Sequence, residues 1–157
     1  MTRRFGSAIA FKAALEARFK TMAAERGTTR NTLQLKFVME RLLARLFLVD
    51  APPWLLKGGF AMDLRFRPRA RTTRDIDLSV IFTSGSPPID FVGAFREQLQ
   101  ESVDVDLGDY LTYRIGTPKR ELTNAPHPGW CSLPLRGDSA WKALRTVSHR
   151  HRLRRPD

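Results

Sequence analysis

The stretch that decides the fold runs from Trp54 to Phe82, with the sequence WLLKGGFAMDLRFRPRARTTRDIDLSVIF. A short apolar run opens it and ends at the glycine pair Gly58 and Gly59. Its last part begins with Asp-Ile-Asp-Leu at 75–78, where carboxylate and apolar side chains alternate as in a strand with one buried face. We therefore predict a strand, a glycine turn, a short helix and a second strand. The helix carries three apolar residues, Phe60, Met62 and Leu64.

The second predicted strand carries a chemical motif. Asp75 and Asp77 are two residues apart, so both point to the same face while Ile76 and Leu78 point into the core. Two carboxylates on one face repel unless a cation lies between them, and Mg²⁺ favours carboxylate, phosphate and water oxygens. Glycines at a helix start let backbone N–H groups approach a phosphate. If the two strands are neighbours, this arrangement suits phosphoryl or nucleotidyl transfer with metal ions.

The combined motif resembles a known family. Leu56-Lys57-Gly58-Gly59 is followed by Arg71-x-Thr73-x-Asp75-Ile76-Asp77. Together these segments resemble the AbiEii/AbiGii toxin family of nucleotidyltransferases, within the polymerase-β-like superfamily. The resemblance covers roughly residues 5–127 and is strongest over 55–78.

The resemblance implies a function and roles for particular residues. It implies transfer of a nucleotide from a nucleoside triphosphate to an acceptor such as tRNA, by the toxin of a bacterial toxin–antitoxin, phage-defence pair with a cognate antitoxin. Gly58 and Gly59 would contact the triphosphate, and Asp75 and Asp77 would be catalytic and hold Mg²⁺. Three neighbours are implied as nucleotide-binding partners: Lys57, Arg71 and Thr73.

The composition sets limits on the partners. The 157 residues suggest one ordinary domain, and the net charge of +11 favours a polyanionic partner, which could be RNA, DNA or an acidic membrane. A single cysteine, Cys131, allows no intrachain disulfide and favours a cytoplasmic location. Charged residues interrupt the N-terminal apolar residues too early for a signal peptide, and no segment is long enough to span a bilayer.

The fold class that we predict is α/β (α+β), with a small mixed sheet and a two-helix N-terminal unit at 1–50. The first helix would cover 7–26, and the second would end near Phe47. The second helix would begin at an Asn31–Gln34 capping box or at a cap on Thr28 or Thr29. Six basic residues would face outward, either as a solvated face or as a track for an RNA backbone. These are Lys12, Arg18, Lys20, Lys36, Arg41 and Arg45.

The core at 54–127 would form one compact unit with these helices. After a loop at 83–88, a helix would bury Phe91, Phe95 and Leu99 against the sheet, and the alternation at 109–116 predicts a strand. Members of the family also use a third carboxylate on a later strand and a downstream lysine. The candidates for these roles are Asp104, Asp106, Asp109 and Lys142.

Residues 128–157 differ in character from the body. They are basic and carry no clear helical or strand period, so we predict a disordered tail that either binds nucleic acid or follows a shifted reading frame. The resemblance implies a longer chain, so we expect a protein truncated or frame-shifted after about residue 127, with weak or no transfer activity. Two other interpretations stay open. One is a non-catalytic basic module that binds RNA or antitoxin, and the other is a nucleotidyltransferase that acts on a small molecule.

Overall fold

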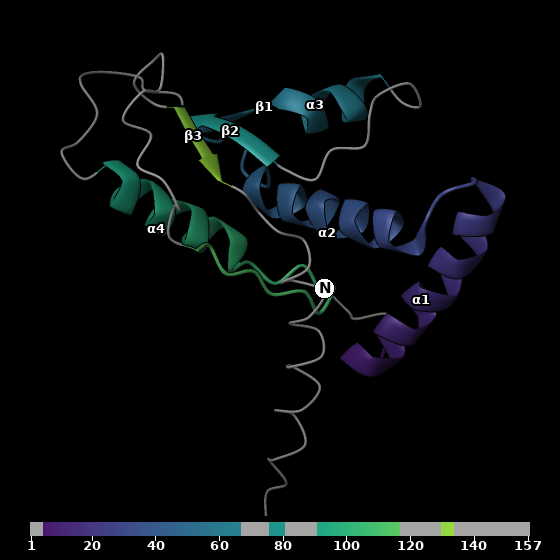
Figure 1. Cartoon of the computed structure of the whole chain (residues 1–157). Coiled ribbons are helices and arrows are strands. Elements are labelled where there is room, and N and C mark those ends of the chain that lie inside the picture. Colours follow the sequence, from purple (N-terminus) through teal and green to yellow (C-terminus); the bar gives the residue numbers. More distant parts are fainter. Residues whose placement is uncertain (1–4, 67–75, 81–90, 117–129, 134–157) are drawn as a thin grey trace, which may run out of the picture. The chain divides into compact units, whose positions relative to one another are not determined.

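The computed structural model describes residues 5–66, 76–80, 91–116 and 130–133. Its elements follow the order α1, α2, β1, α3, β2, α4, β3 (Figure 1). The predicted fold class is confirmed, because a strand–glycine–helix–strand segment follows a pair of helices. The described strands form a three-stranded sheet in the order β1-β2-β3. Both of its pairings are antiparallel, whereas the sequence suggested a mixed sheet.

The chain divides into two compact units. The described residues of the first, here called the helical unit, are 5–45 and 103–114. The described residues of the second, here called the sheet unit, are 46–66, 76–80, 91–102, 115–116 and 130–133. The predicted union of helices and core into one compact unit stays a prediction.

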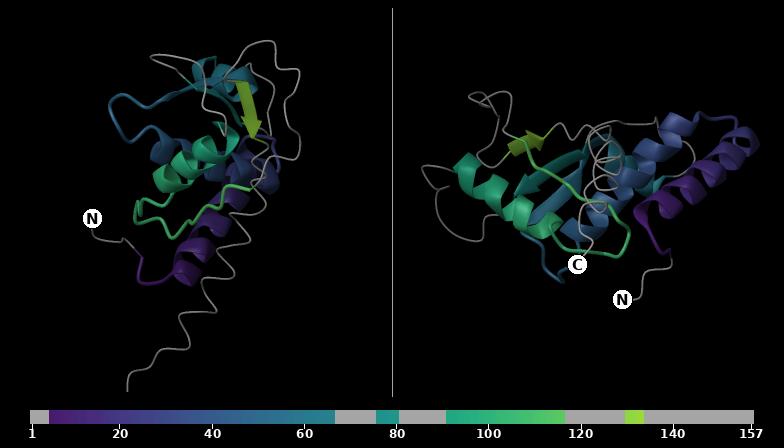
Figure 2. Two further views of the ribbon diagram at one scale, coloured as in Figure 1. Left: turned by 90° about the vertical axis from the view of Figure 1, so that its left-hand side faces the viewer. Right: turned by 90° about the horizontal axis from the view of Figure 1, so that it is seen from below.

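Two helices dominate the helical unit (Figure 2). Helix α1 spans Ala8–Glu25, and the Ser7 hydroxyl caps it by accepting a hydrogen bond from the Ala10 N–H at 3.1 Å. Helix α2 spans Arg30–Leu46. The hydroxyl of Thr29 accepts a hydrogen bond from the Thr32 N–H at 3.2 Å, so Thr29 is the cap. The Asn31–Gln34 capping box is therefore wrong, because Asn31 already lies inside the helix.

Aromatic and aliphatic side chains join these helices. The ring of Phe37 packs against Phe19 at 5.8 Å and against Phe11 at 6.4 Å between centroids. Val38, Met39 and Leu42 of α2 are almost completely buried. Phe19 of α1 is buried as well, so an apolar face of each helix takes part in the packing.

The segment 103–114 completes the helical unit. The Tyr113 hydroxyl donates a 2.8 Å hydrogen bond to the carbonyl of Val38 on α2. Leu111, Tyr113 and Ile115 are buried, while Thr112 and Arg114 are exposed, so the predicted alternation is present. Residues 111–116 nevertheless belong to no strand, which corrects the prediction for 109–116. Alternating apolar and polar residues indicate that one side of a segment is buried. They do not require that the segment is hydrogen-bonded to a neighbouring strand.

In the sheet unit, β1 (Trp54–Lys57) pairs with β2 (Ile76–Val80). Trp54 is buried, its ring packs edge-on against Phe95 with centroids 6.5 Å apart, and its indole N–H donates a 2.8 Å hydrogen bond to the Leu46 carbonyl. Phe95 and Leu99 belong to helix α4 (Phe91–Val103) and are buried, as predicted. The side chain of Phe91 lies outside the described residues.

Helix α3 (Gly58–Arg65) follows β1 without an intervening loop, so Gly58 and Gly59 are its first two residues and are here called the glycine turn. Phe60 is buried, whereas Met62 is 51% exposed. Residues 60 and 64 share a helix face because they are four apart, whereas residue 62 lies on the other side.

Strand β3 (Trp130–Leu133) pairs with β2 and was not predicted. These four residues fall within the range that the sequence assigned to a disordered tail. The remainder of that tail, 128–129 and 134–157, lies outside the described residues. A four-residue strand carries too few side chains for a period to show, so only its pairing with β2 reveals it.

Candidate active site

Asp77 lies in the middle strand of the sheet, between two core residues. Ile76 and Leu78 on either side of it are 0% and 1% exposed, whereas Asp77 itself is partly exposed. The predicted split of the strand, with apolar residues inward and the carboxylate outward, is confirmed at these three positions. Asp75, the other predicted metal ligand, lies outside the described residues.

The pairing of β1 with β2 brings the glycine turn to this carboxylate. Lys57 is the cross-strand partner of Asp77, and Gly58 follows Lys57 directly. A Cβ atom on Gly58 would lie only 2.0 Å from Oδ2 of Asp77. Gly58 and Asp77 are therefore in contact, as the motif requires if the two strands are neighbours.

Lys57 contributes positive charge at the same place. It has extended backbone, with φ = −137°, and occupies the residue before the first turn of α3. Residues directly opposite in an antiparallel pair share a sheet face, so Lys57 and Asp77 form an opposite-charge cross-strand pair. Gly59 is the second residue of α3. Arg71 and Thr73 lie outside the described residues, and the nucleotide-binding roles of all these positions stay predictions.

Carboxylate oxygens are the ligands that Mg²⁺ prefers, and Asp77 supplies them on a partly exposed sheet face. Within the ranges that the structure describes, no group of three or more His, Cys, Asp and Glu side chains could hold a metal ion. The residue opposite Asp77 on β3 is Ser132, and β3 carries no carboxylate. The described part of the site therefore offers one carboxylate, to which the sequence adds Asp75.

The helical unit contains a cluster of charges that sequence analysis missed, here called the Arg45–Asp109 clasp. Arg45 is 2% exposed, and its guanidinium donates to both carboxylate oxygens of Asp109, at 2.6 and 3.0 Å. Arg41 adds a third bond, from Nε to Oδ2 at 2.6 Å. Arg45 also donates to the backbone carbonyls of Arg41, Val105 and Leu111. All the donors of the buried guanidinium group and both carboxylate oxygens are thus used within this unit.

The clasp also shifts the pKa of Asp109. Burial raises the pKa of Asp109, but the hydrogen bonds from Arg45 and Arg41 and the positive charge of Arg45 outweigh it and hold this pKa below its ordinary value. Burial likewise raises the pKa of Tyr113, whose ring lies 4.9 Å from the Arg45 guanidinium carbon. Asp109 is therefore an ionised carboxylate paired inside the protein.

Two sequence interpretations change as a result. Arg41 and Arg45 do not belong to an outward basic track, because they bind Asp109, and Lys12 pairs with Glu16 at 3.6 Å. Asp109 is also unsuited to be a third metal-binding carboxylate, because both of its oxygens accept from arginine. One feature of the sequence could have indicated that Arg45 is buried. Arg45 is three residues after Leu42 and seven after Val38, which places it on the buried face of α2.

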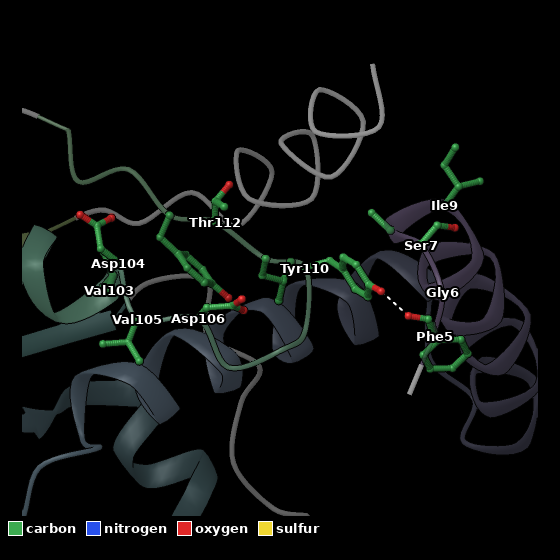
Figure 3. Close-up of a pocket in the computed structure, with 13 residues that line it drawn as sticks. Phe5, Gly6, Ser7, Ile9, Val103, Asp104, Val105, Asp106, Tyr110 and Thr112 are labelled. Carbon is green, nitrogen blue, oxygen red and sulfur yellow. Dashed lines mark hydrogen bonds between the residues drawn. The ribbon is translucent and has the colours of Figure 1, made fainter. Parts of the chain in front are cut away.

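A cavity of about 790 Å³ also lies in the helical unit, between residues 5–9 and the segment 103–113 (Figure 3). The Tyr110 hydroxyl donates to the Phe5 carbonyl across it, and Tyr110 has φ = +58°. Its described lining includes the exposed carboxylates of Asp104 and Asp106 and no lysine or arginine. Such a lining disfavours a triphosphate, so the cavity is not the nucleotide site suggested by the motif.

No helix in the described ranges is long and apolar enough to cross a membrane. Comparison with curated proteins and with solved structures gives no significant match. Residues 41–129 match the family described as "Nucleotidyl transferase AbiEii toxin, Type IV TA system". This match contains the glycine turn, Asp75, Asp77 and α4, and it covers more than half of the chain. The chain belongs to the AbiEii nucleotidyl transferase toxin family of type IV toxin–antitoxin systems.

Proposed function

We propose that this protein binds a Mg²⁺–nucleoside triphosphate between the glycine turn and the Asp75–Asp77 pair, and that its reaction is nucleotide transfer to an RNA acceptor, with tRNA the acceptor that the family resemblance favours. The observation that carries the proposal is the contact between Gly58 and the Asp77 carboxylate. It unites the two halves of the motif, which are separated by 19 positions between Gly58 and Asp77 in the sequence.

Each residue has a proposed task. The Asp75 and Asp77 carboxylates would hold Mg²⁺, which supplies charge neutralisation on the phosphates when bound. The backbone at Gly58 and Gly59 would approach the triphosphate at the positive end of α3. Lys57, opposite Asp77, would add positive charge near the phosphates, and Arg71 and Thr73 would bind nucleotide beside the carboxylates. These tasks concern binding and orientation, which supply much of the catalysis in phosphoryl-type transfer.

We propose further that transfer by this chain is weak or absent. Ser132 stands opposite Asp77 on β3, and Asp109 is held by two arginines. Neither position supplies the third carboxylate that family members use on a later strand. Misaligned or missing charge stabilisation costs orders of magnitude in rate. We therefore expect the chain to bind triphosphate but to transfer nucleotide slowly or not at all.

The setting that we propose is cytoplasmic phage defence, in which the protein is paired with a cognate antitoxin. The net charge of +11 favours an RNA partner. The alternative of a non-catalytic remnant that binds RNA or antitoxin is favoured by the same Ser132 and Asp109 observations.

A labelling assay separates these functions. Purified protein is incubated with Mg²⁺, each labelled triphosphate and bulk tRNA, with Asp75→Asn as the matched control. We expect faint incorporation or none from the parent chain. Robust incorporation that disappears in Asp75→Asn would contradict the weak-transfer proposal and would require Asp104 or Asp106 to complete the site. Triphosphate binding without incorporation, together with tight RNA binding, would favour the remnant.

A further inference from the structure

Gly58, the first residue of α3, lies against Asp77 of β2. Its φ of +71° lies in the left-handed region, where glycine is favoured. Its missing side chain matters separately. A Cβ atom would lie 2.0 Å from Oδ2, 2.9 Å from Cγ and 3.1 Å from Cβ of Asp77. Three atoms of one side chain therefore occupy or border the space that a Cβ would fill.

We propose that Gly58 is a positioning residue for Asp77, whose carboxylate occupies the space left by the absent side chain. The inference rests on the proposed function, because it assigns Asp77 to the metal. It gives Gly58 a second task. The absence of its side chain sets the position of the carboxylate, while the backbone of Gly58 and Gly59 is still proposed to approach the phosphate.

The backbone gives Asp77 little freedom to move away from a larger residue. Lys57 pairs with Asp77, and Leu56 with Leu78, so the register of the two strands fixes the distance between Gly58 and Asp77. Ile76 and Leu78 are fully buried on either side, which anchors β2 to the core. An added methyl group at 58 must therefore turn the carboxylate of Asp77 aside, since the strands themselves are held.

The chain contains a matched control for backbone strain. Gly27 has φ = +60°, and a Cβ placed on it would meet no atom within 4 Å. Gly27→Ala therefore introduces the left-handed strain without the clash, whereas Gly58→Ala introduces both. The difference between the two variants isolates the contact with Asp77.

The first test is a set of unfolding measurements on Gly27→Ala, Gly58→Ala, Asp77→Ala and the Gly58→Ala/Asp77→Ala double variant. We expect Gly58→Ala to lower the denaturation midpoint more than Gly27→Ala. This excess should become smaller when Asp77 is alanine, because alanine lacks Oδ2 and Cγ and keeps only the Cβ at 3.1 Å. Equal losses for the two glycines, or an excess that is undiminished when the Asp77 carboxylate is removed, would overturn the proposal. If Gly58→Ala alone does not fold, recovery of folding in the double variant supports the proposal, and failure of both overturns it.

The second test uses the Mg²⁺ dependence of fluorescent triphosphate binding, which a purely structural glycine would not change in a folded variant. In Gly58→Ala, we expect the Mg²⁺ concentration at half-maximal binding to rise on the order of tenfold or more, since the metal ligand is displaced. Gly27→Ala should bind as the parent does. An unchanged Mg²⁺ midpoint in folded Gly58→Ala would contradict the positioning role. If the parent chain shows no Mg²⁺-dependent triphosphate binding, the proposed function fails. The unfolding measurements on the single and double variants still decide whether Gly58 positions Asp77.

Discussion

Two aspartates in this protein occupy opposite kinds of environment. Asp109 in the helical unit is buried, and its two oxygens accept hydrogen bonds from Arg41 and Arg45. Asp77 in the sheet unit is partly exposed on a sheet face and lies against a glycine turn. A carboxylate enclosed by arginines is committed to structure, whereas the one beside the glycine turn at a helix start is the one that we propose for metal and phosphate binding. The surroundings of each carboxylate, and not its residue type, separate the two roles.

The largest loss of stability is expected when Asp109, the structural member of this pair, is replaced. Asp109→Ala leaves the buried Arg45 charge without its partner, and removing one member of a buried pair costs about 3–5 kcal/mol. Far-UV circular dichroism during denaturant unfolding measures the loss. Asp104→Ala, an exposed aspartate in the same segment, is the control and should change the free energy of unfolding by no more than about 0.5 kcal/mol. Equal effects of the two substitutions would contradict a structural clasp at Asp109.

Lowering the pH should also reveal the structural role of Asp109, with a smaller loss of stability. The pKa of Asp109 is lowered in the folded protein from an ordinary value of 3.8, so its stabilising contribution is complete above pH 3.8 and is lost as the pH falls below that value through the folded pKa. Asp109→Asn removes this titrating group. We expect the parent to lose more stability than Asp109→Asn between pH 4 and pH 2, measured as thermal midpoints. Parallel pH curves for the two proteins would refute the linkage.

The smallest effect distinguishes the two proposed caps of α2. Thr29→Ala removes the hydroxyl that accepts from Thr32 N–H and should cost about 1 kcal/mol of unfolding free energy. Asn31→Ala should change it by no more than about 0.5 kcal/mol, because Asn31 is exposed within the helix. A larger loss for Asn31→Ala would restore the capping box.

Local patterns in the sequence predict much of this fold. Apolar periodicity finds α1, α2 and α4, and alternation places Ile76 and Leu78 in the core with Asp77 outside it. The motif also brings Gly58 to Asp77, because both ends of the strand–helix–strand segment are close in sequence.

The features that were missed depend on contacts between distant residues. Arg45 and Asp109 are 64 positions apart, and no local pattern links them. Strand β3 exists through its ladder with β2, across more than 50 positions between Leu78 and Cys131. Long-range pairing of this kind leaves little trace in a four-residue segment.

The most direct test of the active-site assignment is calorimetric titration of the parent, Asp77→Asn and Asp75→Asn with nucleoside triphosphate, in the presence and absence of Mg²⁺. We predict Mg²⁺-dependent binding by the parent and none by either variant, with far-UV circular dichroism showing that both variants remain folded. Removing one of two like charges does not destabilise the metal-free protein, so both variants should stay folded. The loss of binding would then be due to the lost metal ligand. Unchanged Mg²⁺-dependent affinity in folded Asp77→Asn would contradict the assignment of this site.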